Sequence, residues 1–331
     1  MQQSSKPHVV VIDWSRQPVG DPELAVESAG LGAAASVEYH LCDSDDDFND
    51  RVLSASALIV WHNIPIRAAG IKKLRNCRAI IRNGVGYDSV DLEAGRARGI
   101  PVCNVPDYGT EEVADHALAL SLALARQLFP LDQEAKRLGW QLRVGEKMRR
   151  LRGRTFGVLG LGRIGMAAAL RAKAFGFRVV FYDPYVSNGV DKAVGVDQVD
   201  TLEELLRLSD IVSLHTPLTK ETFHLITARE LSWMKPSAFL VNTARGALVK
   251  KDDLFAALRQ GHIAGAGLDV VEDEPLRHAT EAATPNLIVT CHAAFCSVES
   301  KLEMRATSAR IARAAVLGEK LENVVNGASA P

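Results

Sequence analysis

Short apolar segments alternate with helical patterns along most of the chain. In the first third, strand candidates lie at residues 9–13, 57–61, 78–82 and 101–104, and a helical stretch covers residues 91–98. Continuous apolar segments of this length are typical of parallel strands covered on both faces. The alternation therefore predicts βαβ units and a parallel sheet.

A long helical region separates this series from a second one. Residues 110–138 repeat apolar side chains near the 3.6-residue period, and Glu111 and Glu112 suit a helix N-terminus, so we predict one helix that crosses between two domains. After it we predict a helix over residues 166–175. Six strands are expected here, the number in a complete dinucleotide-binding sheet: one from residue 155, then 178–182, 211–214, 238–242, 265–270 and 287–290.

The end of the chain is again helical in pattern. Residues 301–321 place Met304, Ile311 and Val316 on one possible face of a helix. A length of 331 residues suits two domains. The predicted fold class is therefore α/β, with two doubly wound parallel-sheet domains.

Composition and charge exclude several classes of protein. The chain is 47% hydrophobic and 24% charged, which is typical of a folded globule, and 39 basic against 40 acidic residues give no support to nucleic-acid binding. Five scattered cysteines without a CxxC pair disfavour a disulfide framework and a zinc site and suit a reducing compartment. The longest apolar segment, residues 116–126, is shorter than a membrane span, and residues 1–7 do not resemble a signal peptide. We expect a cytoplasmic protein with no metal, nucleic-acid or membrane partner.

A glycine-rich turn is the strongest local signal. Gly160, Gly162 and Gly165 form a GxGxxG motif between an apolar strand and an alanine-rich helix. Such a turn lets the backbone approach a pyrophosphate, and the amides at the start of the helix bind it. Asp183 ends the next strand, 18 residues after Gly165, where a carboxylate can accept hydrogen bonds from ribose hydroxyls and repel a 2′-phosphate. The motif therefore predicts NAD rather than NADP.

Three polar residues follow neighbouring strand candidates in the second series. Arg245, Glu274 and His292 all lie just after apolar segments, which is where ligands bind in an open α/β sheet. An imidazole can protonate the oxygen of a ketone that is being reduced, and a carboxylate can orient that imidazole. A guanidinium can bind a substrate carboxylate with two hydrogen bonds. Taken singly, each residue is more often structural, so order and spacing alone leave the assignment open.

Several long motifs resemble the D-isomer-specific 2-hydroxyacid dehydrogenase family, and within it most closely the C-terminal-binding-protein (CtBP) branch. The similar segments, which extend from residue 57 onward, are residues 82–88 (RNGVGYD), 102–106 (VCNVP), 160–165 (GLGRIG), 171–177 (RAKAFGF), 181–185 (FYDPY), 239–246 (FLVNTARG) and 292–295 (HAAF). The resemblance implies a Rossmann NAD-binding domain inserted into a flavodoxin-like substrate domain. Residues 1–118 and 299–331 would form the substrate domain, residues 119–298 the NAD-binding domain, and two NAD-binding domains would pair in a homodimer.

The resemblance also implies roles for individual residues. Arg245, Glu274 and His292 would be catalytic, with His292 as the general acid/base. Cofactor contacts would come from Val85, Leu159, Gly160, Leu161, Gly162, Arg163, Ile164, Gly165, Asp183, His215, Thr216, Pro217, Thr222, Thr243, Ala244, Asp269 and Ala293. The substrate carboxylate would meet the backbone amides of Gly84, Val85 and Gly86, helped by Arg82, since glycines allow close approach to an anion. Candidate pocket residues are Trp61, His62, Arg82, Tyr108 and Phe295.

The chain departs from the family pattern in three places. Cys291 stands where the family usually has proline, and Phe295 stands where CtBP corepressors carry tryptophan. The segment before residue 57 matches those corepressors poorly, although it builds their peptide-docking cleft. These departures argue against transcriptional corepression.

The function expected from the sequence is an NAD-dependent oxidoreductase that interconverts a 2-keto acid and an (R)-2-hydroxy acid. The alternative from another class is an NAD(H)-sensing CtBP-like scaffold or corepressor with weak dehydrogenase activity. Formate dehydrogenases share the frame, but Glu274 rather than glutamine beside His292 favours carbonyl protonation. Phosphite oxidation stays open, and the sequence does not name the substrate.

Overall fold

The chain folds into two compact units in a computed structural model that describes residues 6–16, 18–61, 64–146 and 148–328. The first unit combines residues 1–109 with 297–331, and the second comprises residues 110–296. The boundary expected after residue 118 would fall inside the helix α5 (Thr110–Ala125), which packs on the sheet of the second unit. One continuous helix belongs to a single core, so the second unit begins at Thr110, the first residue of α5.

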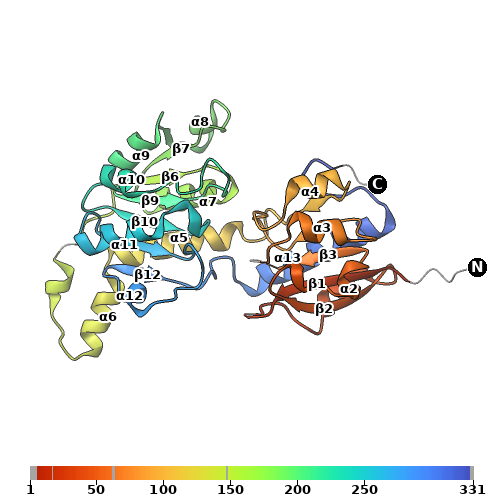
Figure 1. The fold of residues 1–331 in the computed structure, drawn as a ribbon. Helices are drawn as coiled ribbons and strands as arrows, with labels where there is room; N and C mark the ends of the chain where they lie inside the picture. Colours follow the sequence, from red (N-terminus) through yellow and green to blue (C-terminus); the bar gives the residue numbers. More distant parts are fainter. Residues whose placement is uncertain (1–5, 17, 62–63, 147, 329–331) are drawn as a thin grey trace, which may run out of the picture. The chain divides into compact units, whose positions relative to one another are not determined.

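A five-stranded parallel sheet with the order β2-β1-β3-β4-β5 forms the centre of the first unit (Figure 1). This order is the flavodoxin-like doubly wound arrangement. Its elements are β1 (His8–Trp14), α1 (Ala25–Leu31), β2 (Ser36–Cys42), η1 (Asp45–Asp47), α2 (Asp50–Leu53), β3 (Ala57–Val60), α3 (Ala68–Lys73), β4 (Ile80–Arg82), α4 (Leu92–Ala97), β5 (Val102–Cys103) and α13 (Val298–Leu317).

The last helix, α13, returns to the first unit and packs on its sheet. Met304, Ile311 and Val316 are all buried, which confirms the face expected from the sequence. Close packing against α1 depends on Gly30, because a Cβ there would lie 2.7 Å from the Cβ of Ala309. The returning helix therefore belongs to the core of the first unit.

The second unit is built on a seven-stranded parallel sheet with the order β12-β11-β10-β9-β6-β7-β8. The six strands from β8 to β11 have the Rossmann order, and β12 extends it. Its elements are α5, α6 (Leu128–Lys136), η2 (Leu142–Gly145), β6 (Thr155–Leu159), α7 (Arg163–Ala174), β7 (Arg178–Tyr182), α8 (Val190–Val194), β8 (Asp197–Gln198), α9 (Leu202–Leu208), β9 (Ile211–Leu214), α10 (Ala228–Trp233), β10 (Phe239–Asn242), η3 (Gly246–Leu248), α11 (Lys251–Gln260), β11 (Gly265–Leu268), α12 (Ala279–Ala282) and β12 (Leu287–Val289).

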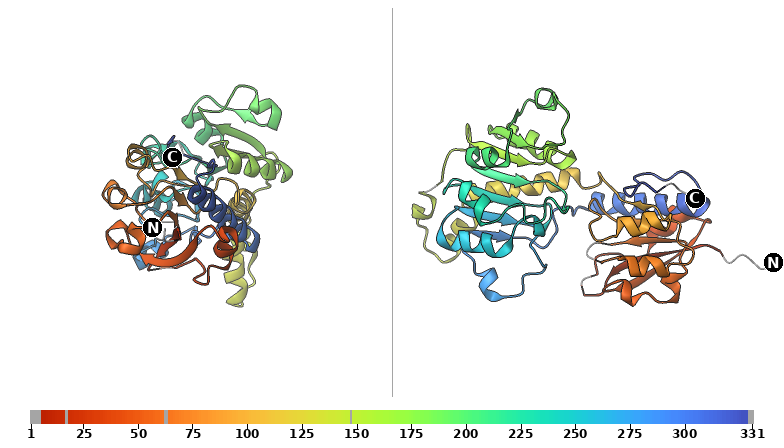
Figure 2. Two further views of the ribbon diagram at one scale, coloured as in Figure 1. Left: turned by 90° about the vertical axis from the view of Figure 1, so that its right-hand side faces the viewer. Right: turned by 45° about the horizontal axis from the view of Figure 1, so that its top comes forward.

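Helices cover both faces of this sheet. One apolar core lies beneath α5 and α7, and a second lies beneath α9, α10 and α11. The right-hand view of Figure 2 shows α5 running along the sheet, where a Cβ on Gly267 of β11 would lie 3.0 Å from the Cβ of Leu120. This close contact fixes α5 over the strands that end at the candidate site.

The helix expected over residues 110–138 is instead two helices. It breaks between α5 and α6, where Gln127 has a φ of 52°. Pro130 explains the break, because it has no N–H to donate to the carbonyl of Arg126 and its ring would clash with that carbonyl. Proline is tolerated in the first turn of a helix, which is its place in α6.

Two strands were not expected from the sequence. β2 is an edge strand whose residues are mostly half-buried, among them Glu38 and His40, and β8 has only two residues. Neither contains the apolar run that identified the other strands. In the part of the chain that the structure describes, no helix has both the length and the apolar character to span a bilayer.

Candidate active site

The glycine-rich turn joins β6 to α7 at the carboxyl edge of the second sheet. Gly160 has a φ of 90°, and a Cβ there would lie 2.9 Å from Cγ2 of Thr216. A Cβ on Gly165 would lie 2.0 Å from the carbonyl oxygen of Gly160. Only glycine permits this tight strand–turn–helix connection.

Asp183 holds the glycine-rich turn. Its Oδ2 accepts a hydrogen bond of 2.9 Å from the amide of Leu161, and its Oδ1 accepts one of 2.9 Å from the amide of Tyr185. The carboxylate thus connects the end of β7 to the turn after β6. Each oxygen retains a lone pair that can accept a bond from a ribose hydroxyl.

Around the same turn, one glycine borders open space and two threonine hydroxyl groups are buried. A Cβ on Gly162, which precedes the first residue of α7, would meet no atom within 4 Å. Among the described residues, Thr216 Oγ1 and Thr243 Oγ1 are buried without a hydrogen-bond partner. Buried hydroxyls are normally bonded, so these two groups, which follow β9 and β10, fit a polar ligand at this edge.

His215 and Thr222 belong to the loop after β9. Nε2 of His215 lies 2.9 Å from Ser213 Oγ, and desolvation lowers the pKa of His215 to about 4, so its ring is neutral at pH 7. Thr222 Oγ1 donates to the carbonyl of Pro217 over 2.7 Å and accepts from the amide of Thr219 over 2.8 Å. Thr222 therefore shapes the loop that carries Thr216.

His292 and Glu274 meet at the carboxyl ends of β12 and β11. His292 Nδ1 lies 2.9 Å from Glu274 Oε2, and each side chain retains about a fifth to a quarter of its exposure. Oε1 of Glu274 accepts a bond of 3.3 Å from the amide of Val271. The pair has the geometry of an imidazole oriented by a carboxylate.

The loop of Arg245 follows β10, the next strand of the sheet. Asn242 spans this loop, since its Nδ2 donates to the carbonyl of Arg245 over 2.8 Å and its Oδ1 accepts from the amide of Ala244 over 3.0 Å. A Cβ on Gly246 would lie 2.1 Å from the carbonyl oxygen of Val271. The Arg245 loop therefore packs directly on the segment that leads to Glu274.

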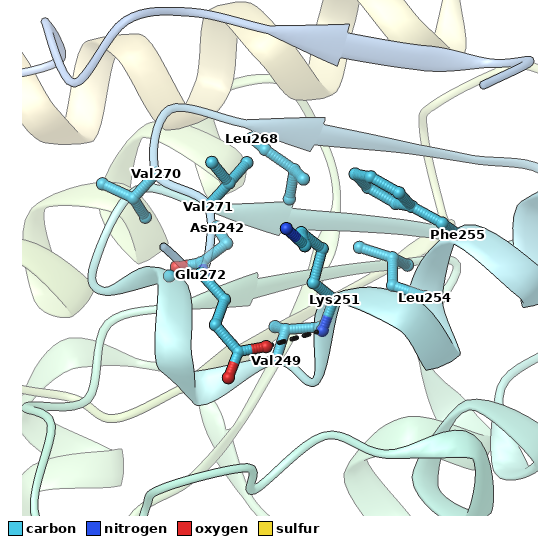
Figure 3. A pocket seen from close by; sticks show the side chains of 10 residues that line it. Asn242, Val249, Lys251, Leu254, Phe255, Leu268, Val270, Val271 and Glu272 are labelled. Atoms are coloured by element: carbon cyan, nitrogen blue, oxygen red, sulfur yellow. Dashed lines mark hydrogen bonds between the residues drawn. The ribbon is translucent and has the colours of Figure 1, made fainter. Parts of the chain in front are cut away.

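A small pocket lies next to these two loops (Figure 3). Glu272 reaches its edge, where Oε2 accepts from the amide of Lys251 over 3.1 Å and Oε1 lies 2.5 Å from His224 Nε2. The other walls are mainly apolar. Both oxygens of Glu272 are bonded within the chain, so this side chain supports the neighbouring loops.

Asp269, which the family resemblance places at the cofactor, is bonded within the chain. Its Oδ1 and Oδ2 accept bonds of 2.9 Å from the amides of Ala293 and Ala294. Thr290 donates to its Oδ1 over 2.5 Å, and His116 contacts Thr290. Sequence reasoning missed Asn242, Thr290 and His116, whose partners lie on other loops or helices.

Several of the candidate substrate residues gather at the carboxyl edge of the first sheet. A Cβ on Gly84, whose φ is 146°, would lie 1.8 Å from Arg82 Nη1 and 3.4 Å from the hydroxyl of Tyr108. Asn104 Nδ2 donates to the carbonyl of Val85 over 2.7 Å and holds the turn that continues to Gly86. These contacts bring Arg82, Gly84 and Tyr108 together.

The remaining pocket candidates lie in different places. Trp61 is buried at the end of β3, with its Nε1 3.0 Å from the Cβ position of Gly20. Phe295 belongs to the second unit, and its ring meets that of His292 edge-on with centroids 6.4 Å apart. His62 lies outside the described residues. In the described part of the chain, no cluster of three or more His, Cys, Asp or Glu side chains could hold a metal ion.

The chain is similar to one protein family and to several known proteins. The family model described as D-isomer specific 2-hydroxyacid dehydrogenase, NAD binding domain, matches residues 118–294. C-terminal-binding protein 1 of Caenorhabditis elegans is 35% identical over 327 residues, which cover 95% of this chain and 44% of that protein. D-3-phosphoglycerate dehydrogenase of Methanocaldococcus jannaschii is 36% identical over 301 residues, which cover 91% of this chain and 57% of that protein. The chain spans about half the length of these curated relatives.

A solved structure extends the similarity to the whole chain. The D-lactate dehydrogenase from Aquifex aeolicus, determined with NAD and lactic acid, superposes with a TM-score of 0.85 at 30% identity. The match covers 94% of this chain and 96% of that one. Both units, and not the glycine-rich turn alone, therefore have counterparts in one known fold.

Proposed function

Because the chain belongs to the D-isomer specific 2-hydroxyacid dehydrogenase family, we propose that it is an NAD-dependent oxidoreductase that interconverts a 2-keto acid and an (R)-2-hydroxy acid. The observation that carries the proposal is the His292–Glu274 pair, 2.9 Å apart, at the edge of the sheet that also bears the glycine-rich turn. The cytoplasm is the proposed location, since five scattered cysteines suit a reducing compartment.

Each residue at this edge has a defined task in the proposed reaction. His292 gives a proton to the carbonyl oxygen during reduction and removes it during oxidation. Glu274, at Nδ1 of the ring, orients His292. Arg245 binds the substrate carboxylate and polarises the neighbouring carbonyl group.

The residues around the glycine-rich turn fit a dinucleotide. The amides at the start of α7 would hold the pyrophosphate, Asp183 the adenosine ribose, and the hydroxyls of Thr216 and Thr243 other polar groups of the cofactor. When bound, the nicotinamide supplies or accepts the hydride. Arg163, Ile164, Pro217 and Ala244 complete the proposed cofactor contacts of the second unit.

The first unit is the proposed substrate domain, and the second is the NAD-binding domain. The support is the cluster of Arg82, Gly84 and Tyr108 at the carboxyl edge of the first sheet, which is where α/β folds bind ligands. The amides of residues 84–86 and the guanidinium of Arg82 suit a substrate carboxylate. In this unit, Trp61 is a proposed wall for a substrate side chain larger than methyl.

A panel of 2-keto acids tests this function. The purified protein is mixed with NADH and each acid, and oxidation is followed by NADH absorbance. We expect turnover with at least one acid and an (R)-2-hydroxy acid as product. Tight NADH binding without turnover of any acid would favour the NAD(H)-sensing scaffold instead.

We expect a preference for NAD(H) over NADP(H). The Asp183 carboxylate would face the 2′-phosphate, and no lysine or arginine follows within residues 184–186. Because a difference of about 1.4 kcal/mol is tenfold, kcat/KM should be at least roughly 10-fold higher with NADH than with NADPH. The two values are measured on one preparation with one acid, and equal values would contradict the proposal.

A second copy of the chain is the proposed partner of α6 and the segment after it. The family resemblance is one support for this proposal, and the exposure of this region is another. Its exposed apolar side chains are Leu128, Phe129, Leu138, which is 91% exposed, and Trp140, which is 84% exposed. None of the described residues of α6 is buried. Large apolar side chains exposed together in one region are typical of an association surface. Light scattering after size exclusion should show a dimer that Leu138→Asp with Trp140→Asp converts to a monomer. Val298→Asp, at an apolar position 83% exposed in the first unit, is the control and should stay dimeric.

A further inference from the structure

We propose that His116 and Thr290 are positioning residues that fix the Asp269 carboxylate and, through it, the loop that presents His292. The inference rests on the proposed function, since it assigns these residues to the same reaction. His116 lies on α5, and Thr290 immediately follows β12, 174 positions further along the chain. Neither would contact substrate, so both would act through other groups.

The direction of the hydrogen bonds follows from chemistry. An ionised carboxylate only accepts, so Thr290 Oγ1 donates its proton to Asp269 Oδ1 over 2.5 Å. The Thr290 oxygen is then an acceptor for His116 Nε2, which lies 2.9 Å away. His116 must therefore carry a proton on Nε2, and the chain of bonds runs in one direction, from His116 through Thr290 to Asp269.

Asp269 is the point where this chain meets the loop of His292. Each of its carboxylate oxygens accepts a bond of 2.9 Å from a loop amide, Ala293 on Oδ1 and Ala294 on Oδ2. Its backbone carbonyl also accepts a bond of 2.8 Å from the amide of His292. The two residues after His292 and His292 itself are thus held by one buried aspartate, which is 2% exposed.

The loop needs this support because of its backbone conformation. His292 has a φ of 54°, in the left-handed region that a residue with a Cβ adopts only at a cost. Strained backbone of this kind persists only where the surrounding contacts determine it. The Asp269 bonds supply those contacts, and Thr290 and His116 keep the carboxylate in the one orientation that serves both amides.

His116 connects the loop to a rigid part of the unit. α5 packs on β10 and β11, and the His116 side chain is 26% exposed with Nε2 3.7 Å from Asp269 Oδ1. A ring held by a 16-residue helix gives the Thr290 hydroxyl a second fixed partner besides Asp269 and so limits its rotation at the end of a short strand. The helix thereby sets the position from which His292 reaches its substrate.

Two pairs of variants in the full-length protein test the chain of bonds. Thr290→Val removes the hydroxyl at nearly constant volume, and Thr290→Ser keeps it. His116→Leu removes the donor, and His116→Gln keeps an N–H that can reach the same oxygen. Asp115→Asn is the matched control, because it changes the neighbouring residue of α5 and breaks an exposed ion pair with Arg171.

Small displacements of a reacting group have large kinetic effects, so Thr290→Val should lower kcat roughly 10- to 100-fold, with a much smaller change in the Kd of NADH. His116→Leu should have a weaker effect of the same kind, while kcat in Thr290→Ser, His116→Gln and Asp115→Asn should stay near the wild-type value.

In the double variant His116→Leu/Thr290→Val, the loss of kcat should not exceed that of Thr290→Val alone, because the effects of residues in one chain of bonds are not additive. Amide hydrogen exchange of residues 290–296 should be faster in Thr290→Val than in wild type.

Three outcomes would overturn the inference: wild-type kcat in Thr290→Val, losses that multiply in the double variant, or unchanged amide exchange of residues 290–296. The exchange measurement needs no substrate. If the wild type turns over no 2-keto acid, the proposed function fails, and the exchange rates of Thr290→Val and Thr290→Ser still decide whether this chain holds the loop.

Discussion

We expect His292→Ala to lower kcat for 2-keto acid reduction about 10²–10⁴-fold, the usual contribution of a general acid. Alanine cannot give a proton to the carbonyl oxygen, while the glycine-rich turn is unchanged. NADH should therefore bind with nearly wild-type Kd, measured by fluorescence titration. His262→Ala, at an exposed position after α11, is the control and should keep wild-type kcat. Full activity in His292→Ala would remove the proposed mechanism.

The partner of His292 should show itself in the rate of reduction. Glu274 Oε2 lies 2.9 Å from His292 Nδ1 and orients the ring. Glu274→Ala removes this partner, so kcat/KM for reduction should fall while the Kd of NADH stays near that of the wild type. An unchanged kcat/KM would mean that Glu274 does not orient His292.

The second large effect is expected at the glycine-rich turn, where two neighbouring glycines should respond differently. In Gly165→Ala, the new Cβ would lie 2.0 Å from the Gly160 carbonyl oxygen. This oxygen belongs to the backbone and cannot move without distorting the turn. Forced overpacking costs about 1–3 kcal/mol, so Tm should fall by several degrees. NADH binding should be lost with the geometry of the turn.

Gly162→Ala should weaken NADH binding without changing the stability of the fold. Its Cβ would meet no atom of the chain within 4 Å, and its φ of −73° is open to alanine, so Tm should equal that of the wild type. The methyl group would occupy the side from which a pyrophosphate approaches the amides of α7. The Kd of NADH should rise at least roughly 10-fold, a change of about 1.4 kcal/mol. An unchanged Kd in Gly162→Ala would exclude this turn as the cofactor site.

Features with a local signature were predictable from the sequence. The glycine-rich turn was found because only glycine fits its conformation, so the spacing of Gly160, Gly162 and Gly165 carries the geometry. The family resemblance marked Arg245, Glu274 and His292 as candidate catalytic residues, and the carboxyl ends of parallel strands meet at one edge of a sheet. The strands β10, β11 and β12 are neighbours in the structure, and the His292–Glu274 bond follows from that order.

Tertiary structure decided the features that depend on partners far apart in the chain. Asp183 holds the amide of Leu161, and Asp269 holds the loop of His292, although the sequence only marks both as acids after strands. Hydrogen bonds between distant loops have no period and no spacing, so the sequence alone offers candidate reacting groups, and the fold determines which residues hold those side chains in place.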